Sequence, residues 1–336
     1  MKPIAAARLK AFLAEHLGTP PRRLEVHRLL GDASDRTYYR LLLDEEKTLV
    51  LAHYIGSFTL EHHPYYTMDQ LLRKLSLDTP RILGCRQEEG MLLLEDLGDK
   101  TLYHLFPSLE REERESIYRR VIDILITLQT EGTKHLTPRH QAYHLAFDEE
   151  KLMEELNFFY QHYLIGLLKR EIPPEDESLI RRWFTRLSSE LAALPRVLCH
   201  RDYHSRNLML KGGKIYLIDF QDARMGPYSY DLVSLLRDSY IELEEGTVEE
   251  LIHYYLAHHP HFKPRRDGER FLDEFDLMAL QRNIKAIGTF AYQAVAKGNT
   301  FYRQFIPPTL RYIHRNLINR EEWRDIRSLL SRYMEV

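Results

Sequence analysis

The chain has 336 residues, of which 44% are hydrophobic and 29% charged, a balance typical of a soluble globular protein. Its 47 basic and 50 acidic side chains give a net charge of −3, which excludes an overall positive field directed at nucleic acid or an anionic membrane surface. Cys85 and Cys199 lack the close-spaced partners of a zinc or redox motif, so we expect free thiols in a reducing compartment.

Short strand-like runs dominate the first hundred residues. Apolar residues at helical spacing predict a helix over 4–17, and the charges inside this segment exclude a signal peptide. No stretch approaches the roughly 20 apolar residues of a membrane span, so we expect a cytoplasmic protein. A helix is predicted near 65–75, and the β-like runs around it cover 24–30, 37–43, 48–54, 81–85 and 91–95.

The chain after Gly98 has a mostly helical pattern. The order of strands first and helices later predicts an α+β fold with two lobes, a strand-rich lobe over 1–97 and a helical lobe over 98–336. The predicted helices of the second lobe cover 110–131, 149–170, 177–193, 247–259 and 268–297.

The polar residues with the most specific spacing lie in L-C-H-R-D-Y-H-S-R-N-L-M-L, K-G-G-K and I-Y-L-I-D-F-Q-D-A, in the helical half. Gly212 and Gly213, between two short apolar runs, predict a β-hairpin. A hairpin brings its outer ends together, so we expect Asp202 and Asn207 before it to lie near Asp219 after it. Two carboxylates and a carboxamide oxygen suit Mg²⁺, which is bound by few protein ligands together with phosphate and water.

Each of these residues also has a purely structural interpretation. Asp202 alone could be a turn or capping residue, Asn207 a loop amide and Asp219 the end of a strand. The joint spacing of H-x-D-x-x-x-x-N, hairpin and I-D-F favours the catalytic interpretation. The side chains around Asp202 are expected to hold the loop, because a zinc site would need imidazole or thiolate ligands in a closed geometry. These loop-holding side chains are His200, Arg201 and His204.

The run H-R-D-Y-H-S-R-N followed by D-F-Q-D resembles the aminoglycoside phosphotransferase and choline kinase family, a branch of the protein-kinase-like fold. Within this family the sequence is more similar to the bacterial anomeric kinases of N-acetylmuramate and N-acetylglucosamine. The motifs that carry this closer resemblance lie at 31–34 (G-D-A-S), 92–99 (L-L-L-E-D-L-G-D), 220–238 (F-Q-D-A to L-L-R-D) and 280–291 (L-Q-R-N-I-K-A-I-G-T-F-A). The resemblance implies a two-lobed fold with a nucleotide-binding first lobe and an acceptor site in the second.

The resemblance also implies a role for each matching residue. Asp202 would orient the acceptor hydroxyl and take its proton, while Asn207 and Asp219 would hold Mg²⁺ against the phosphates of ATP. The turn over these phosphates would contain Gly31 and Ser34. The hinge backbone groups that bind the adenine would belong to Glu95 and Leu97.

One lysine of protein kinases has no counterpart in this sequence. Protein kinases carry it in the strand motif V-A-I-K, where it pairs with the α- and β-phosphates, whereas the corresponding run L-V-L-A-H-Y has none. His53 is nearest by position but is often neutral at pH 7. We therefore expect Arg36 or Arg40 to supply the positive charge; the alternative is that both are surface arginines.

The acceptor side is specified by fewer residues. Gln221 and Asp222 are expected to face the acceptor and to bind sugar hydroxyls, with support of the metal loop as the alternative. Arg282 and Lys285 lie three apart on one helix face and could reach an acceptor carboxylate, with an ion-paired surface as the alternative. Asp231, at a predicted helix start, is expected to cap that helix or to brace the catalytic loop.

These expectations combine into one predicted activity. We predict a Mg²⁺-dependent enzyme that moves the γ-phosphate of ATP to the anomeric hydroxyl of N-acetylmuramate or N-acetylglucosamine, with a small-molecule amino sugar as its partner and neither nucleic acid nor a membrane. A kinase for another acceptor, such as an aminoglycoside, choline or homoserine, stays open, as does a nucleotide-binding pseudokinase that has lost turnover. Nothing in the sequence separates ATP from GTP or sets an oligomeric state.

Overall fold

The computed structural model describes residues 6–29, 36–44, 47–318 and 320–334. Its contacts divide the chain into two compact units. We call the first the strand unit and the second the helical unit. The strand unit consists of Met1–Lys100 and Met209–Gln221, and the helical unit of Thr101–Leu208 and Asp222–Val336.

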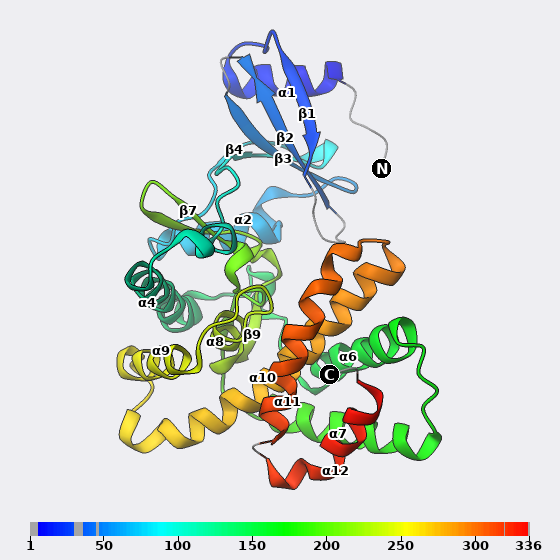
Figure 1. Cartoon of the computed structure of the whole chain (residues 1–336). Coiled ribbons are helices and arrows are strands. Elements are labelled where there is room, and N and C mark those ends of the chain that lie inside the picture. Colours follow the sequence, from blue (N-terminus) through cyan, green and yellow to red (C-terminus); the bar gives the residue numbers. More distant parts are fainter. Residues whose placement is uncertain (1–5, 30–35, 45–46, 319, 335–336) are drawn as a thin grey trace. The chain divides into compact units, whose positions relative to one another are not determined.

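An antiparallel sheet with the strand order β1-β2-β3-β5-β4 forms the body of the strand unit (Figure 1). Helix α1 buries Leu9, Phe12 and Leu13 against sheet residues that include Leu41 and Leu93. The short apolar runs of the sequence become strands because they can bury such side chains on one face of the sheet. The elements are α1 (Ala6–Leu17), β1 (Leu24–Arg28), β2 (Arg36–Leu43), β3 (Thr48–Tyr54), α2 (Pro64–Lys74), β4 (Ile82–Arg86) and β5 (Met91–Glu95).

The hairpin predicted around the glycine pair is confirmed, and it belongs to the strand unit. Gly212 and Gly213 have φ angles of 58° and 75°, as a two-residue hairpin turn with positive φ at both central positions requires. The backbone N–H of Leu217 donates to the carbonyl oxygen of Asp78 at 2.9 Å, which joins the hairpin to the strand unit, whereas the sequence had placed it with the helical lobe. The two strands are β7 (Leu208–Lys211) and β8 (Lys214–Leu217).

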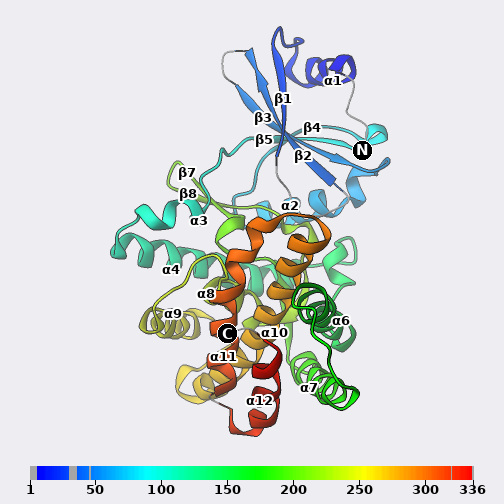
Figure 2. The ribbon, with the colours of Figure 1, turned by 45° about the vertical axis from the view of Figure 1, so that its right-hand side comes forward.

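A long helix, α10 (Pro264–Ala296), forms the centre of the helical unit (Figure 2). It packs against α6 (Glu149–Phe159), α8 (Ser229–Leu236) and α11 (Ile306–Ile318). Gly288 permits the close contact with α6, because a Cβ at this position would lie 2.7 Å from the Cα of Phe159. A distance this short is a backbone collision, so the contact fixes the position of α10 along α6.

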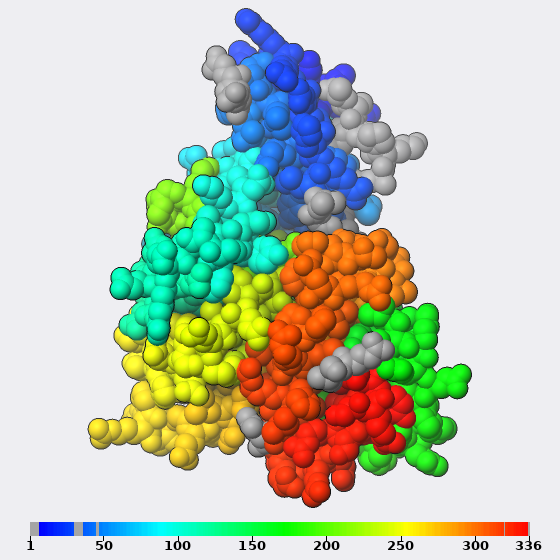
Figure 3. Space-filling model, viewed as in Figure 1, coloured from blue at the N-terminus to red at the C-terminus, as the bar shows by residue number. Residues whose placement is uncertain are grey.

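Other helices of this unit also contact α10, among them α7 (Pro174–Ala192) and α9 (Glu245–His258). Figure 3 shows the C-terminal helix α12 in red beside the green segment that contains α7, and Arg170 Nε donates to the carbonyl oxygen of Tyr333 there at 3.0 Å. The helices predicted over 110–131, 177–193 and 247–259 are confirmed to within a few residues, whereas α11 and α12 were not predicted. The remaining helices are α3 (Leu102–Leu105), α4 (Arg111–Thr127), α5 (Thr133–His135), α7 (Pro174–Ala192), α9 (Glu245–His258) and α12 (Arg324–Tyr333).

One strand pair of the helical unit was also not predicted. β6 (Arg196–Cys199) pairs antiparallel with β9 (Arg224–Pro227), and each has four residues. Four residues are too few for a periodic pattern, and Gly226-Pro227 within β9 resembles a turn signal. The predicted α+β class is confirmed, with a small antiparallel sheet in one unit and mostly helices in the other. Across the described ranges, no helix is both long enough and apolar enough to cross a bilayer.

Candidate active site

The loop that follows β6 carries the predicted base, Asp202, and residues 200–207 form what we call the catalytic loop. Asn207 Nδ2 donates to the backbone carbonyl oxygen of Asp202 at 2.9 Å, which ties the two ends of the sequence motif together. Arg201 has a backbone φ of 85°, in the left-handed region that residues other than glycine rarely adopt. Such a conformation costs about 1–3 kcal/mol and persists only where the surroundings impose it.

Two buried carboxylates impose this backbone conformation. Asp231 accepts hydrogen bonds from the backbone N–H groups of His200 at 2.6 Å and Arg201 at 3.1 Å. Asp238 accepts one from the N–H of Ser205 at 2.9 Å. Burial raises the pKa of Asp231 to about 7 and that of Asp238 to about 6, although the N–H groups act in the opposite direction. The sequence left open whether Asp231 caps its helix or braces the loop, and these hydrogen bonds are of the bracing kind.

The sequence analysis did not single out Asp238. The available signal was its spacing of seven residues after Asp231, which places two acids on one face of a helix and its extension. Because most residues around Asp231 and Asp238 are apolar, an acidic side chain there indicates a buried hydrogen-bond acceptor.

The side chain of Asp202 lies among three cations. Lys285 Nζ is 3.0 Å from Asp202 Oδ1, Arg282 Nη1 is 3.7 Å from the same oxygen, and Arg201 Nε is 3.9 Å from Oδ2. Burial alone would raise the pKa of Asp202, but the charges of Lys285, Arg201 and Arg282 outweigh it and hold the pKa well below its ordinary value. With 25% of its side chain exposed, Asp202 is an ionised carboxylate that a small molecule can reach.

Arg282, predicted to bind the acceptor, is held by the protein itself. Its Nη1 donates to the carbonyl oxygen of Arg201 at 3.0 Å and to Tyr230 Oη at 2.8 Å, and its Nη2 donates to Ser234 Oγ at 2.6 Å. With 9% of its side chain exposed, this guanidinium is oriented toward the catalytic loop rather than toward a ligand. The contacts therefore favour support of the loop over recognition of the acceptor.

Two histidines, His200 and His204, lie in the catalytic loop. Burial lowers the pKa of His204 to about 3, so its imidazole is neutral at pH 7. His200 is 2% exposed and packs edge-on against Tyr203. Within the part of the chain that the structure describes, no three His, Cys, Asp or Glu side chains come together as a metal-binding group. The loop-holding role of both histidines stays a prediction.

The predicted metal ligand Asp219 lies in the strand unit, at the end of the hairpin. Its backbone is also left-handed, with a φ of 63°. Its Oδ1 accepts hydrogen bonds from Arg36 Nη2 and from Gln221 Nε2, both at 2.7 Å. Gln221 is 4% exposed, so the structure favours the alternative in which it supports the metal loop. Asp222 is more open, with 46% of its side chain exposed, and lies 3.8 Å from Arg201 Nη1.

The two candidate arginines of β2 differ in their partners. Arg36 is 12% exposed and paired with Asp219, beside the predicted phosphate region. Arg40 binds two hinge carboxylates, Asp96 at 2.7 Å and Asp99 at 2.8 Å. The contacts therefore favour Arg36 as the phosphate-side cation and a hinge-holding role for Arg40. The predicted phosphate-turn residues, Gly31 and Ser34, lie outside the described residues.

The predicted hinge residues lie at the end of β5. The Glu95 N–H donates to the carbonyl oxygen of Arg81 at 2.8 Å, and its carboxylate accepts from Arg81 Nε at 3.1 Å. Leu97, two residues after β5, is buried, with 7% of the residue exposed. Its predicted contact with the adenine stays a prediction.

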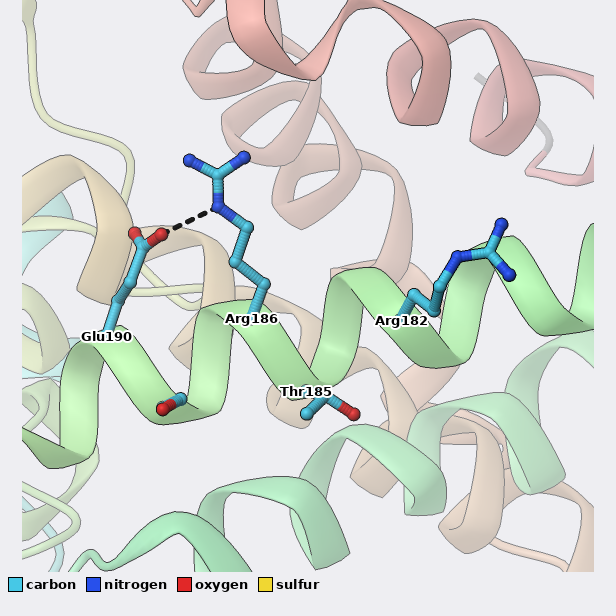
Figure 4. Close-up of a pocket in the computed structure, with 5 residues that line it drawn as sticks. Arg182, Thr185, Arg186 and Glu190 are labelled. Carbon is cyan, nitrogen blue, oxygen red and sulfur yellow. Dashed lines mark hydrogen bonds and ion pairs between the residues drawn. The ribbon is translucent and has the colours of Figure 1, made fainter.

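A shallow hollow on the surface of α7 offers no comparable chemistry (Figure 4). Arg186 Nε donates to Glu190 Oε1 at 2.7 Å, and Arg182 Nη1 donates to Ser178 Oγ at the same distance. All of these side chains come from one helix and pair along it, so they do not converge on a ligand.

Comparisons with known proteins show the family of the chain. Residues 25–272 match the family described as the phosphotransferase enzyme family. The chain belongs to this family. The N-acetylmuramate/N-acetylglucosamine kinase of Neisseria meningitidis serogroup B is 30% identical over 307 residues, which cover 88% of this chain and 86% of that protein. The protein of the same name from Pseudomonas aeruginosa is 30% identical over 328 residues, or 95% of this chain and 91% of that protein.

Solved structures agree on the fold. The ADP-bound aminoglycoside phosphotransferase APH(2'')-Ib superposes with a TM-score of 0.60 at 15% identity, over 92% of this chain and 98% of that chain. A choline kinase from Cryptosporidium parvum superposes with a TM-score of 0.59 at 14% identity, over 97% of this chain and 98% of that chain. The phosphotransferase therefore has the kinase-like fold, and with its family and its relatives it is a small-molecule kinase.

Proposed function

We propose that this phosphotransferase moves the γ-phosphate of ATP to an N-acetylated amino sugar at its anomeric hydroxyl. The shared name of the relatives at 30% identity supports the substrate class, and the resemblance of the sequence motifs to anomeric kinases supports the position. The observation that carries the proposal is the environment of Asp202, a partly exposed carboxylate whose pKa is held well below its ordinary value by nearby cations.

The two oxygens of Asp202 have different surroundings, which supports different roles for them. Oδ1 accepts a hydrogen bond from Lys285, whereas Arg201 Nε, at 3.9 Å, is beyond hydrogen-bond distance of Oδ2. Oδ2 is therefore the oxygen that would accept the proton of the acceptor hydroxyl. The hydroxyl oxygen would form a bond to the γ-phosphorus while the bond to the β,γ-bridging oxygen breaks. ADP leaves, and the proton passes from Asp202 to solvent.

The proposed metal ligands fit Mg²⁺ by their chemistry. Because Asn207 Nδ2 donates to a carbonyl oxygen, its Oδ1 would be the atom that binds a cation. Asp219 adds a carboxylate, and both ligands are hard oxygens of the kind that Mg²⁺ prefers. When bound, Mg²⁺ would neutralise charge on the β- and γ-phosphates. Arg36 and Gln221 would orient the Asp219 carboxylate for this contact.

A direct test is ADP release by the purified protein with Mg-ATP and a panel of acceptors. The panel contains N-acetylmuramate, N-acetylglucosamine, glucose, kanamycin, choline and homoserine. We expect turnover on the N-acetyl sugars, and a kcat about 10²–10⁴-fold lower for Asp202→Asn, since the variant keeps the shape of the base and removes its charge. Turnover on kanamycin, choline or homoserine alone would contradict the proposed substrate, and ATP binding without any turnover would favour the pseudokinase.

A further inference from the structure

Lys285 is the cation closest to the proposed base, and it comes from a distant part of the sequence. It lies on α10 and donates to Asp202 Oδ1 at 3.0 Å, 83 residues away along the chain. Its side chain is 17% exposed, and that of Asp202 is 25% exposed. Both groups are thus accessible to a small ligand while they remain in contact with each other.

The ammonium of Lys285 has N–H donors that make no hydrogen bond within the described residues, whereas the guanidinium of Arg282 makes three hydrogen bonds. A lysine ammonium has three N–H donors, and within the described residues Asp202 Oδ1 is its one hydrogen-bond acceptor. Arg282 donates to Arg201, Tyr230 and Ser234, so its orientation is already set. Of these two cations, Lys285 is the one that can donate to a ligand without losing its protein contact.

Phosphoryl transfer requires positive charge around the transferring group, because negative charge is spread over its equatorial oxygens. The strand that supplies a lysine in protein kinases has none here, and Arg40 of β2 is committed to Asp96 and Asp99. A cation fixed beside the base would contact the phosphoryl group at the side where the acceptor oxygen attacks, since the base and that oxygen share a proton.

We propose that Lys285 is a catalytic residue that donates one N–H to Asp202 and another to the transferring phosphoryl group. This inference rests on the proposed function of Asp202. Lys285 would neutralise charge that develops during transfer, and it would align the base with the attacking hydroxyl. Gly288, less than one helical turn from Lys285, packs so closely against α6 that a Cβ there would collide with the α6 backbone. This close packing holds α10 in place, so the Lys285 side chain extends from a rigid helix.

Kinetics of four variants test the proposal. We expect Lys285→Met to lower kcat about 10²–10³-fold, as the removal of one preorganised donor does, with the KM for ATP changed less than about threefold. Lys285→Arg keeps the charge and should recover part of kcat. Lys297→Met, at the exposed C-terminal end of α10, removes a similar charge and should leave kcat unchanged. In Lys285→Ala, added ethylamine should raise kcat in a saturable manner.

Thermal unfolding and acceptor binding by calorimetry separate catalysis from a structural role. A folded Lys285→Met protein that binds the acceptor and retains kcat within threefold of the original would overturn the proposal. Failure of ethylamine to rescue a folded Lys285→Ala protein, together with an inactive Lys285→Arg, would also overturn it. If Asp202→Asn kept full activity, the proposed function itself would fail, whereas an inactive Asp202→Asn beside an active Lys285→Met would reject only the lysine.

Discussion

The catalytic loop of the helical unit and the segment around Asp219 of the strand unit are held in different ways. Each contains a non-glycine residue with a left-handed backbone, Arg201 at φ 85° and Asp219 at φ 63°. In the catalytic loop, buried Asp231 and Asp238 accept hydrogen bonds from backbone N–H groups. Such contacts fix the chain itself, so the base is positioned by the fold.

Asp219 is held by side chains instead. Its carboxylate accepts hydrogen bonds from Arg36 and Gln221, and 39% of its side chain is exposed. Contacts between side chains can rearrange when a cation binds, without a change of backbone. The proposed base is therefore preorganised, whereas the proposed metal ligand retains the freedom to adjust to its ion.

Removal of Asp231 should have the largest effect. Asp231→Ala leaves two buried N–H groups without their acceptor, which should lower the free energy of unfolding by about 2–4 kcal/mol. The freed loop should misplace Asp202 and lower kcat about 100-fold. Urea unfolding and ADP release measure the two effects. Asp231→Asn keeps one acceptor oxygen, so it should lose less stability and less kcat. Full activity in Asp231→Ala would show that the loop is held by other contacts.

Removal of Gln221 should have a smaller and different effect. Gln221→Ala deletes one hydrogen bond to the Asp219 carboxylate, so we expect the Mg²⁺ concentration for half-maximal rate to rise about 10-fold. ADP release across a Mg²⁺ titration at fixed ATP measures this shift. A raised KM for the amino sugar with an unchanged Mg²⁺ requirement would instead support the acceptor-facing interpretation of Gln221.

The pH dependence of stability should also depend on Asp231. The folded-state pKa of Asp231, about 7, lies above the ordinary value of 3.8, so the folded protein binds more protons than the unfolded chain between these pH values. Its contribution to stability is therefore present at pH 4 and lost as pH rises toward 7. Urea unfolding at pH 4.5, 6 and 7.5 should show a flatter decline for Asp231→Asn than for the unsubstituted protein. Equal slopes for the two proteins would contradict the raised pKa.

The sequence was informative where the chemistry is local in the chain. Asp202, Asn207 and the hairpin lie within about twenty residues, so spacing and turn chemistry predict their arrangement. Arg282 and Lys285 share one helix face, and no pattern could decide which of them would reach Asp202. That choice depends on where α10 packs, which the Gly288 contact determines.

Ion pairs between residues far apart in the chain could not be predicted from the sequence either. Arg36 and Arg40 are four residues apart on one strand, yet one binds Asp219 and the other binds Asp96 and Asp99. Alternation places both on the same face of β2, but the partners come from segments more than fifty residues away. Only the packed structure distinguishes a cation near the proposed metal ligand from one that holds the hinge.

The most direct test of the central claim is the identity of the product. After incubation of the phosphotransferase with Mg-ATP and N-acetylmuramate, ³¹P and ¹H NMR would locate the new phosphate ester. We expect a phosphate coupled to the anomeric proton, formed by the unsubstituted protein and absent with Asp202→Asn. A phosphate on another hydroxyl, or an equal yield from Asp202→Asn, would contradict it.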